Sequence, residues 1–143
     1  MRGNPHRLRP ETYPSRLDLP TRFGDMDANG HLNNVAIAQL FEEARVQFNT
    51  GTAKLFDAPR PRFMVAHVGI DYLAEGHYPH PVALMLGVAH IGTSSFRMAM
   101  AAFQGEVCIA LSDAVLVVRG PEGGAAALPA ILRERLEAHR LLG

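Results

Sequence analysis

A loop rich in Asp, Asn and Gly, followed directly by an apolar helix, constrains this chain more than any other feature. Residues 22–34 read Arg-Phe-Gly-Asp-Met-Asp-Ala-Asn-Gly-His-Leu-Asn-Asn, and such residues favour turns because they tolerate left-handed backbone and bond their own main chain. The next segment is predicted to be a helix, with Asn33 or Asn34 as its N-cap. A carboxylate-bearing loop therefore meets a helix N-terminus, whose free N–H groups and partial positive charge favour anions. These are the parts that acyl-group hydrolysis needs, a carboxylate to act on water or carbonyl and dipoles to hold an oxyanion.

The predicted helix is apolar on more than one face. Its apolar residues are Val35, Ala36, Ile37, Ala38, Leu40, Phe41, Ala44 and Phe48. A helix that is apolar nearly all round is usually buried. In a chain of this size we therefore expect a central helix wrapped by a sheet.

The remaining pattern predicts strands joined by short turns. Alternation, β-forming residues and Gly- or Pro-containing breaks predict strands at 17–23, 63–72, 82–91, 96–103 and 107–119. Pro20 in the first of them indicates an edge strand, and a final helix is predicted to begin at Pro129. Short connections between consecutive strands indicate an antiparallel sheet, so the predicted fold class is α+β, with the sheet curled around the long helix.

The chain is long enough for one domain with one core, since it has 143 residues. The proline-rich start, with Pro5, Pro10 and Pro14, predicts a flexible N-terminal arm over residues 1–15. Residues 16–143 are predicted to form the single domain.

Composition excludes several classes of partner. Lys and Arg together number 14, as do Asp and Glu, so no charge excess indicates nucleic acid or an anionic membrane as a partner. No apolar run is long enough to span a bilayer, and no apolar stretch at the start predicts a signal peptide. The single Cys108 excludes an intrachain disulfide framework and indicates a reducing compartment, so a cytoplasmic location is expected.

Calcium binding is a rival interpretation of the loop. Asp25-x-Asp27-x-Asn29-Gly30 matches the opening of an EF-hand loop. The twelfth position, which should be Glu, is Ala36, and prolines exclude an incoming helix. Four further histidines lack the spacing of a zinc motif: His67, His77, His80 and His90. We therefore expect no metal site.

The loop and helix carry a family resemblance. The run Arg22…Asp25-x-Asp27-x-x-Gly30-His31-x-Asn33-Asn34…Glu42-Glu43-Ala44-Arg45 resembles the signature of hotdog-fold acyl-CoA thioesterases of the 4-hydroxybenzoyl-CoA thioesterase type. The predicted element order fits that fold from about residue 16 onward. The resemblance implies hydrolysis of an acyl-CoA or acyl-carrier-protein thioester to free acid and thiol, with coenzyme A as part of the substrate and no separate cofactor.

The resemblance also implies roles for individual residues. Asp27 would be the catalytic carboxylate, as nucleophile or general base, and the backbone N–H of Asn34 would polarise the thioester carbonyl, with Asn33 beside it. The run Asp27-Ala28-Asn29-Gly30-His31 also looks like the Asp-x-Asn-x-His pattern of plant acyl-carrier-protein thioesterases. That likeness implies His31 as an acid or base and Asn29 as a positioning residue.

Two departures from the family pattern keep alternatives open. Many bacterial relatives have Tyr where this chain has Ile37, and relatives with a second catalytic His have it where Asn34 stands. His31 could instead be a helix-entry residue that bonds the loop backbone. Another branch uses a Glu on the central helix, which makes Glu42 or Glu43 a reserve candidate, unless Glu42 only pairs with an Arg one turn later.

Coenzyme A carries phosphates, which need cations or free amides. The turn at Thr93, Ser94 and Ser95 could offer amides. The available cations are Arg60, Arg62, Arg97 and Arg119. Cys108 has no base near it in sequence, so a packed core thiol is expected.

An open sheet also has edges that a second copy could cover. We therefore expect a homodimer with composite active sites, or a dimer of dimers. Two function classes follow, an acyl-thioester hydrolase and a non-catalytic acyl-thioester binding protein on the same fold. Retention of the whole Asp27 loop favours the hydrolase.

Overall fold

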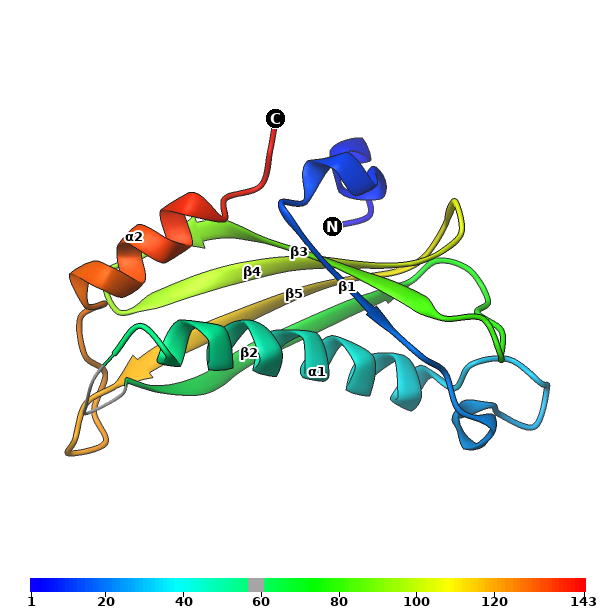
Figure 1. Cartoon of the computed structure of the whole chain (residues 1–143), viewed down its shortest axis with the longest axis horizontal. Helices are drawn as coiled ribbons and strands as arrows, with labels where there is room; N and C mark the ends of the chain where they lie inside the picture. Colours follow the sequence, from blue (N-terminus) through cyan, green and yellow to red (C-terminus); the bar gives the residue numbers. More distant parts are fainter. Residues whose placement is uncertain (57–60) are drawn as a thin grey trace.

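The computed structural model describes residues 1–56 and 61–143 and contains an antiparallel sheet with a long helix across one face (Figure 1). Within the described residues the sheet has five strands in the order β1-β3-β4-β5-β2. The strands are β1 (Ser15–Leu19), β2 (Arg62–Tyr72), β3 (Val82–Ile91), β4 (Ser95–Gln104) and β5 (Val107–Arg119). The predicted α+β architecture is confirmed. Pro59 and Arg60, part of the connection before β2, lie outside the described residues.

Strand β1 is shorter than predicted. It ends at Leu19 because Pro20 cannot donate to the ladder, and Phe23 instead begins a short 3-10 helix, η3 (Phe23–Asp25). The edge position expected from Pro20 is confirmed, since β1 pairs with β3 alone. The predicted turn before β5 is also confirmed, with Gly105 at φ 59°, a conformation that suits glycine.

Helix α1 (Asn34–Ala53) packs one side against the sheet. Its contacting side is apolar: Ala36, Ile37, Leu40, Phe41, Ala44 and Phe48 are all buried. The prediction of a helix buried all round is wrong for a single chain, because the sheet covers only one side. Val35 and Val46 remain 58% and 55% exposed.

The sheet separates two apolar cores. Along β3, Leu84 and Leu86 belong to the core beneath α1, whereas Met85 belongs to a second cluster with Tyr13. This is the period-two alternation of a strand whose two faces are both covered. The face opposite α1 is called the outer face below.

Residues 1–14 cover part of the outer face and are not the loosely attached arm expected from the sequence. They form the 3-10 helices η1 (Pro5–Leu8) and η2 (Pro10–Thr12), each begun by a proline. Arg7 and Tyr13 are buried. The prolines therefore begin tight turns here.

Helix α2 (Ala130–Ala138) begins after Pro129, as predicted. Leu132 and Leu136 are fully buried, whereas Ile131 is 42% exposed. Arg135 Nε donates to Thr52 Oγ1 at 2.7 Å and ties α2 to the end of α1. None of the helices in the described residues combines the length and apolarity that crossing a membrane requires.

Candidate active site

The carboxylate of Asp27 organises the loop before α1. Its Oδ1 accepts from the backbone N–H of Asn29 at 2.8 Å and of His31 at 3.1 Å. The backbone N–H of Asp27 donates to the carbonyl of His31 at 2.7 Å, and Gly30 adopts φ 79° to close the turn. Oδ2 accepts no hydrogen bond from any described residue. The hydrogen bonds to Oδ1 thus fix the position of the exposed carboxylate and leave Oδ2 open to solvent.

Asp25 is in a different environment from Asp27. It is only 7% exposed, and its two oxygens accept from the guanidinium and the backbone N–H of Arg22, both at 2.9 Å. The hydrogen bond from the Arg22 guanidinium lowers the pKa of the Asp25 carboxyl. Its carbonyl accepts from the N–H of Asn33 at 2.7 Å. Asp25 therefore shapes the loop and holds Arg22.

Asp25→Asn should therefore destabilise the loop at neutral pH. A lowered folded-state pKa adds stability above the unfolded-state pKa of about 3.9, and this is lost as pH falls through the folded-state value. The thermal midpoint of the variant should lie below wild type at about pH 7 and approach it at about pH 2. Circular dichroism melts at both pH values measure this, and equal midpoints at neutral pH would contradict it.

The start of α1 presents the expected helix N-terminus. Asn33 is the N-cap, its side-chain oxygen accepting from the N–H of Val35 at 2.8 Å. Because the N–H of Asn33 is bonded to Asp25, the first amide without a partner among the described residues is that of Asn34. Tyr72 Oη donates to the carbonyl of Asn34 at 2.8 Å and braces this first turn.

The side chain of His31 meets a residue that sequence reasoning missed. His31 Nε2 lies 3.1 Å from Glu75 Oε2, in the connection between β2 and β3, and the ring packs edge-on against His77. His31 also bonds the Asp27 loop through its backbone, so the helix-entry interpretation holds for the main chain. No pattern in the sequence predicts the pairing of Glu75 with His31, because only the folded sheet brings the segment after β2 next to the Asp27 loop.

The connection between β3 and β4, which contains Thr93, Ser94 and Ser95, lies at the end of the sheet opposite to the Asp27 loop (Figure 1). The carbonyl of Ser94 accepts from the N–H of Val118, near the end of β5, whereas the N–H of Leu32, in the loop that holds Asp27, donates to the carbonyl of Gly76, beyond the end of β2. Because β2 and β5 are antiparallel, these are opposite ends. One chain therefore does not bring Thr93, Ser94 and Ser95 to Asp27.

Of the arginines considered as phosphate-binding cations, those that the structure describes lie in different parts of the sheet. Arg62 and Arg119 are direct cross-strand partners at the same end as Ser94, and Arg97 is exposed on β4. Arg60 lies outside the described residues.

The reserve carboxylates Glu42 and Glu43 are exposed on α1. Arg45 is buried, and its burial lowers the pKa of the guanidinium, while the charge of Glu42 acts in the opposite direction. Among the described residues Arg45 Nη1 is buried without a hydrogen-bond partner, so the alternative that Glu42 only pairs with Arg45 finds no ion pair in the structure. Burial raises the pKa of the Cys108 thiol, as for a packed thiol. Among the described residues no group of three His, Cys, Asp or Glu side chains could hold a metal ion.

A five-stranded antiparallel sheet with a long helix across one face is the architecture of the hotdog fold. Solved structures agree with this assignment. The PA5185 protein from Pseudomonas aeruginosa is 27% identical, with a TM-score of 0.81 over 92% of this chain and 94% of that one. A thioesterase from Thermus thermophilus, solved with coenzyme A and Zn, is 28% identical, with a TM-score of 0.76 over 90% and 95%.

A 1,4-dihydroxy-2-naphthoyl-CoA thioesterase from Synechocystis shares the fold at 17% identity, with a TM-score of 0.72 over 85% of this chain and 93% of that one. The model of the thioesterase-like superfamily matches residues 21–136. This chain therefore belongs to the thioesterase-like superfamily, and the prediction of a thioesterase is confirmed at that level. No curated protein matches the chain.

Proposed function

We propose that this chain hydrolyses the thioester of an acyl-CoA to free acid and thiol, with an acyl-carrier-protein thioester as the second substrate class. The observation that carries the proposal is that one short loop supplies both a carboxylate oxygen on Asp27 and the backbone N–H of Asn34, neither of which has a hydrogen-bond partner among the described residues. The bond from Asn33 to Asp25 and the bond from Asp27 to His31 tie the two parts together. The Thermus relative was solved with coenzyme A, which supports this substrate class.

The arrangement suggests how the reaction proceeds. The N–H of Asn34 would donate to the thioester carbonyl and stabilise the oxyanion that develops in the transition state. Asp27 would either attack the carbonyl carbon, giving an anhydride that water then hydrolyses, or take a proton from an attacking water. The thiolate leaves in either route. Asn29, whose N–H bonds Asp27, would keep the carboxylate in place.

A direct test uses purified protein, a panel of acyl-CoAs and a thiol-detecting dye. Release of free thiol, absent in Asp27→Asn protein, supports the hydrolase. Acyl-CoA binding by calorimetry without thiol release across the panel would instead support the non-catalytic binding protein.

We further propose a homodimer formed through β2. This strand pairs with β5 on one side only, and its apolar residues Met64, Val65 and Val68 are 40–47% exposed. An unpaired apolar edge readily accepts another strand. Antiparallel pairing of two β2 strands would carry the partner's β3–β4 turn towards Asp27, so the Thr93 to Ser95 amides would serve the other subunit's site.

The double variant Val65→Lys/Val68→Lys should therefore be monomeric and at least about tenfold less active, because each site loses the part that the other subunit supplies. Sedimentation and thiol release measure the two effects. Val107→Lys is the control, since Val107 is 53% exposed but lies at the start of β5. A monomer with full activity would overturn the composite site.

His31→Ala should lower kcat by about 100-fold, the lower range for loss of an acid or base. Glu75→Gln should lower kcat by about tenfold, since Glu75 only orients the imidazole of His31. It should lower kcat no further in protein that already carries His31→Ala. This double-mutant cycle distinguishes a coupled pair from two independent residues. If His31→Ala lowered kcat by less than about threefold, His31 would not be an acid or base, and Asp27 and the helix amide would be the only catalytic groups proposed.

A further inference from the structure

Tyr72, the last residue of β2, reaches across to the first turn of α1. Its Oη donates to the carbonyl of Asn34 at 2.8 Å, which is a typical length for a hydrogen bond between two oxygens. The proposed mechanism needs the backbone N–H of Asn34, so this hydroxyl is bonded to the same residue that supplies the oxyanion donor. The two residues are 38 positions apart in the chain, and no pattern in the sequence joins them.

The first turn of α1 has few other attachments. The first N–H groups of a helix have no partner within it, and helix ends fray. Asn34 and Val35 are both exposed, so side-chain packing holds them weakly. The N–H of Asn33 donates to the carbonyl of Asp25 at 2.7 Å, which ties the turn to the loop. The hydrogen bond from Tyr72 ties it to the sheet.

The end of β2 gives Tyr72 a rigid base. Tyr72 is the cross-strand partner of Ala110 in β5. Just beyond it, the N–H groups of Leu73 and Ala74 both donate to the carbonyl of Ile109, at 2.9 and 3.2 Å, and Ile109 is fully buried. A hydroxyl on this base can therefore fix the turn to which it is bonded.

The hydroxyl of Tyr72 lies behind the oxyanion donor rather than in front of it. In an α-helix the N–H groups point towards the N-terminus and the carbonyls towards the C-terminus. A group that bonds the carbonyl of Asn34 therefore leaves free the space in front of its N–H, where a thioester carbonyl would bind. This arrangement suits a residue that acts through Asn34 and does not touch the reacting atoms.

The phenol of Tyr72 is a donor at neutral pH. Its side chain is 41% exposed, and the burial of the remainder raises the pKa of the phenol above its ordinary value, which is about 10. A raised pKa keeps the phenol in its neutral, protonated form across the physiological range. The hydrogen bond to Asn34 therefore does not depend on pH in that range.

We propose that Tyr72 is a positioning residue for thioester hydrolysis, whose hydroxyl fixes the first turn of α1 so that the N–H of Asn34 points at the developing oxyanion. The inference rests on the proposed function. A preorganised donor stabilises a transition state because it needs no reorganisation at the moment of reaction. Without the hydroxyl, the turn that carries the donor would have to be ordered in each turnover, which lowers kcat and leaves substrate binding unchanged.

Tyr72→Phe tests this, because it removes the hydroxyl and keeps the ring, so the fold should be retained. Tyr78→Phe is the matched control. Tyr78 is 37% exposed, its ring packs edge-on against Phe23, and among the described residues its hydroxyl has no hydrogen-bond partner. Thiol release gives kcat and KM. Hydrogen exchange read by NMR follows the amides of Val35 and Ile37, which are hydrogen-bonded within the first turn.

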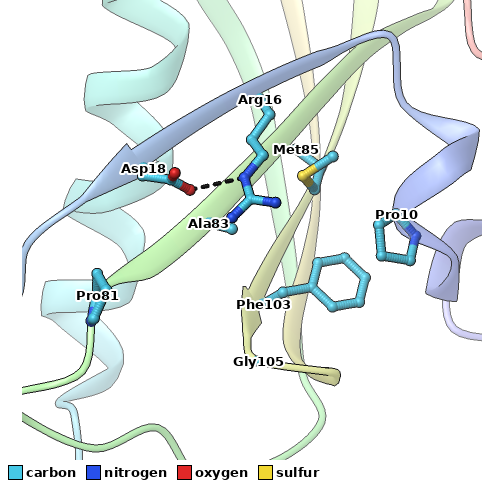
Figure 2. A pocket seen from close by; sticks show the side chains of 8 residues that line it. All are labelled: Pro10, Arg16, Asp18, Pro81, Ala83, Met85, Phe103 and Gly105. Atoms are coloured by element: carbon cyan, nitrogen blue, oxygen red, sulfur yellow. Dashed lines mark hydrogen bonds and ion pairs between the residues drawn. The ribbon is translucent and has the colours of Figure 1, made fainter.

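A second control removes a polar contact on the other face of the sheet. Figure 2 shows Arg16 Nε bonded to Asp18 Oδ1 at 2.9 Å, at the rim of a cavity of about 210 Å³. The cavity is lined in part by Met85 and Phe103, which belong to the outer face. Arg16→Gln breaks this exposed ion pair, and such pairs contribute little to stability. Its kcat and its exchange rates should match those of wild type.

Tyr72→Phe should lower kcat by about tenfold and leave KM within about twofold of wild type, because the contact matters only when the oxyanion forms. The amides of Val35 and Ile37 should exchange about tenfold faster, as expected for loss of one hydrogen bond. In protein that already carries Asn34→Pro, which has no N–H at that position, Tyr72→Phe should lower kcat no further. Tyr78→Phe should match wild type in every measurement.

Three results would overturn the proposal. They are a kcat of Tyr72→Phe within about twofold of wild type, unchanged exchange at Val35 and Ile37, and an undiminished further loss in the Asn34→Pro protein. If wild-type protein releases no thiol from any acyl-CoA, the proposed hydrolysis fails instead. Hydrogen exchange then decides alone whether Tyr72 fixes the first turn of α1.

Discussion

Asp27→Asn is expected to lower the rate of thioester hydrolysis by about 100- to 10,000-fold. An amide can neither attack the carbonyl carbon nor take a proton from water. The fold should be retained, because the amide oxygen of Asn can still accept from the N–H groups of Asn29 and His31, as Oδ1 of Asp27 does. The side chain is exposed, so removal of its charge leaves no buried group unpaired.

The measurement is a comparison of kcat with the thermal midpoint and with acyl-CoA binding. Only kcat should change in Asp27→Asn, whereas Asp25→Asn, which alters the buried carboxylate, should mainly lower the midpoint. This contrast between two neighbouring acids separates chemistry from loop stability. If Asp27→Asn kept more than about a tenth of the wild-type rate, well above the expected range, Asp27 would not be the catalytic carboxylate and Glu42 or Glu43 should be tested.

Asn34→Pro should have the next largest effect, because it deletes the backbone N–H that we assign to the oxyanion. Loss of one such donor costs about 100- to 1,000-fold in kcat. Proline is well tolerated at the first position of a helix. It requires the preceding residue to be extended, and Asn33 already is, with φ −63° and ψ 142°. The Tyr72 bond to the Asn34 carbonyl and the cap on Val35 are unaffected.

Asn34→Ala is the matched control, since it removes the side chain and keeps the N–H. It should retain most of the wild-type kcat, with the same helix content by circular dichroism as Asn34→Pro. A proline variant with correct helix content and near wild-type kcat would exclude Asn34 as the donor. An equal loss in both variants would assign the effect to the side chain instead.

The sequence by itself predicted the elements whose formation is local. Strands 82–91 and 107–119 have the predicted limits, because alternation and flanking turn residues act within a few positions. The start of α1 was predictable for the same reason, since Asn33 caps a helix through an amide two residues away. The candidate catalytic loop was visible because its carboxylates, glycine and helix start are contiguous.

Only the tertiary structure decided which distant segments meet. The pairing of His31 with Glu75, the separation of Thr93 from Asp27 and the exposed side of α1 all depend on the path of β2 and on strand order. The prolines of residues 1–14 predicted a loose arm, yet Arg7 finds Asp113 more than a hundred residues away. Local propensity carries no information about such a contact, because its free energy comes from partners that only the folded sheet brings within reach.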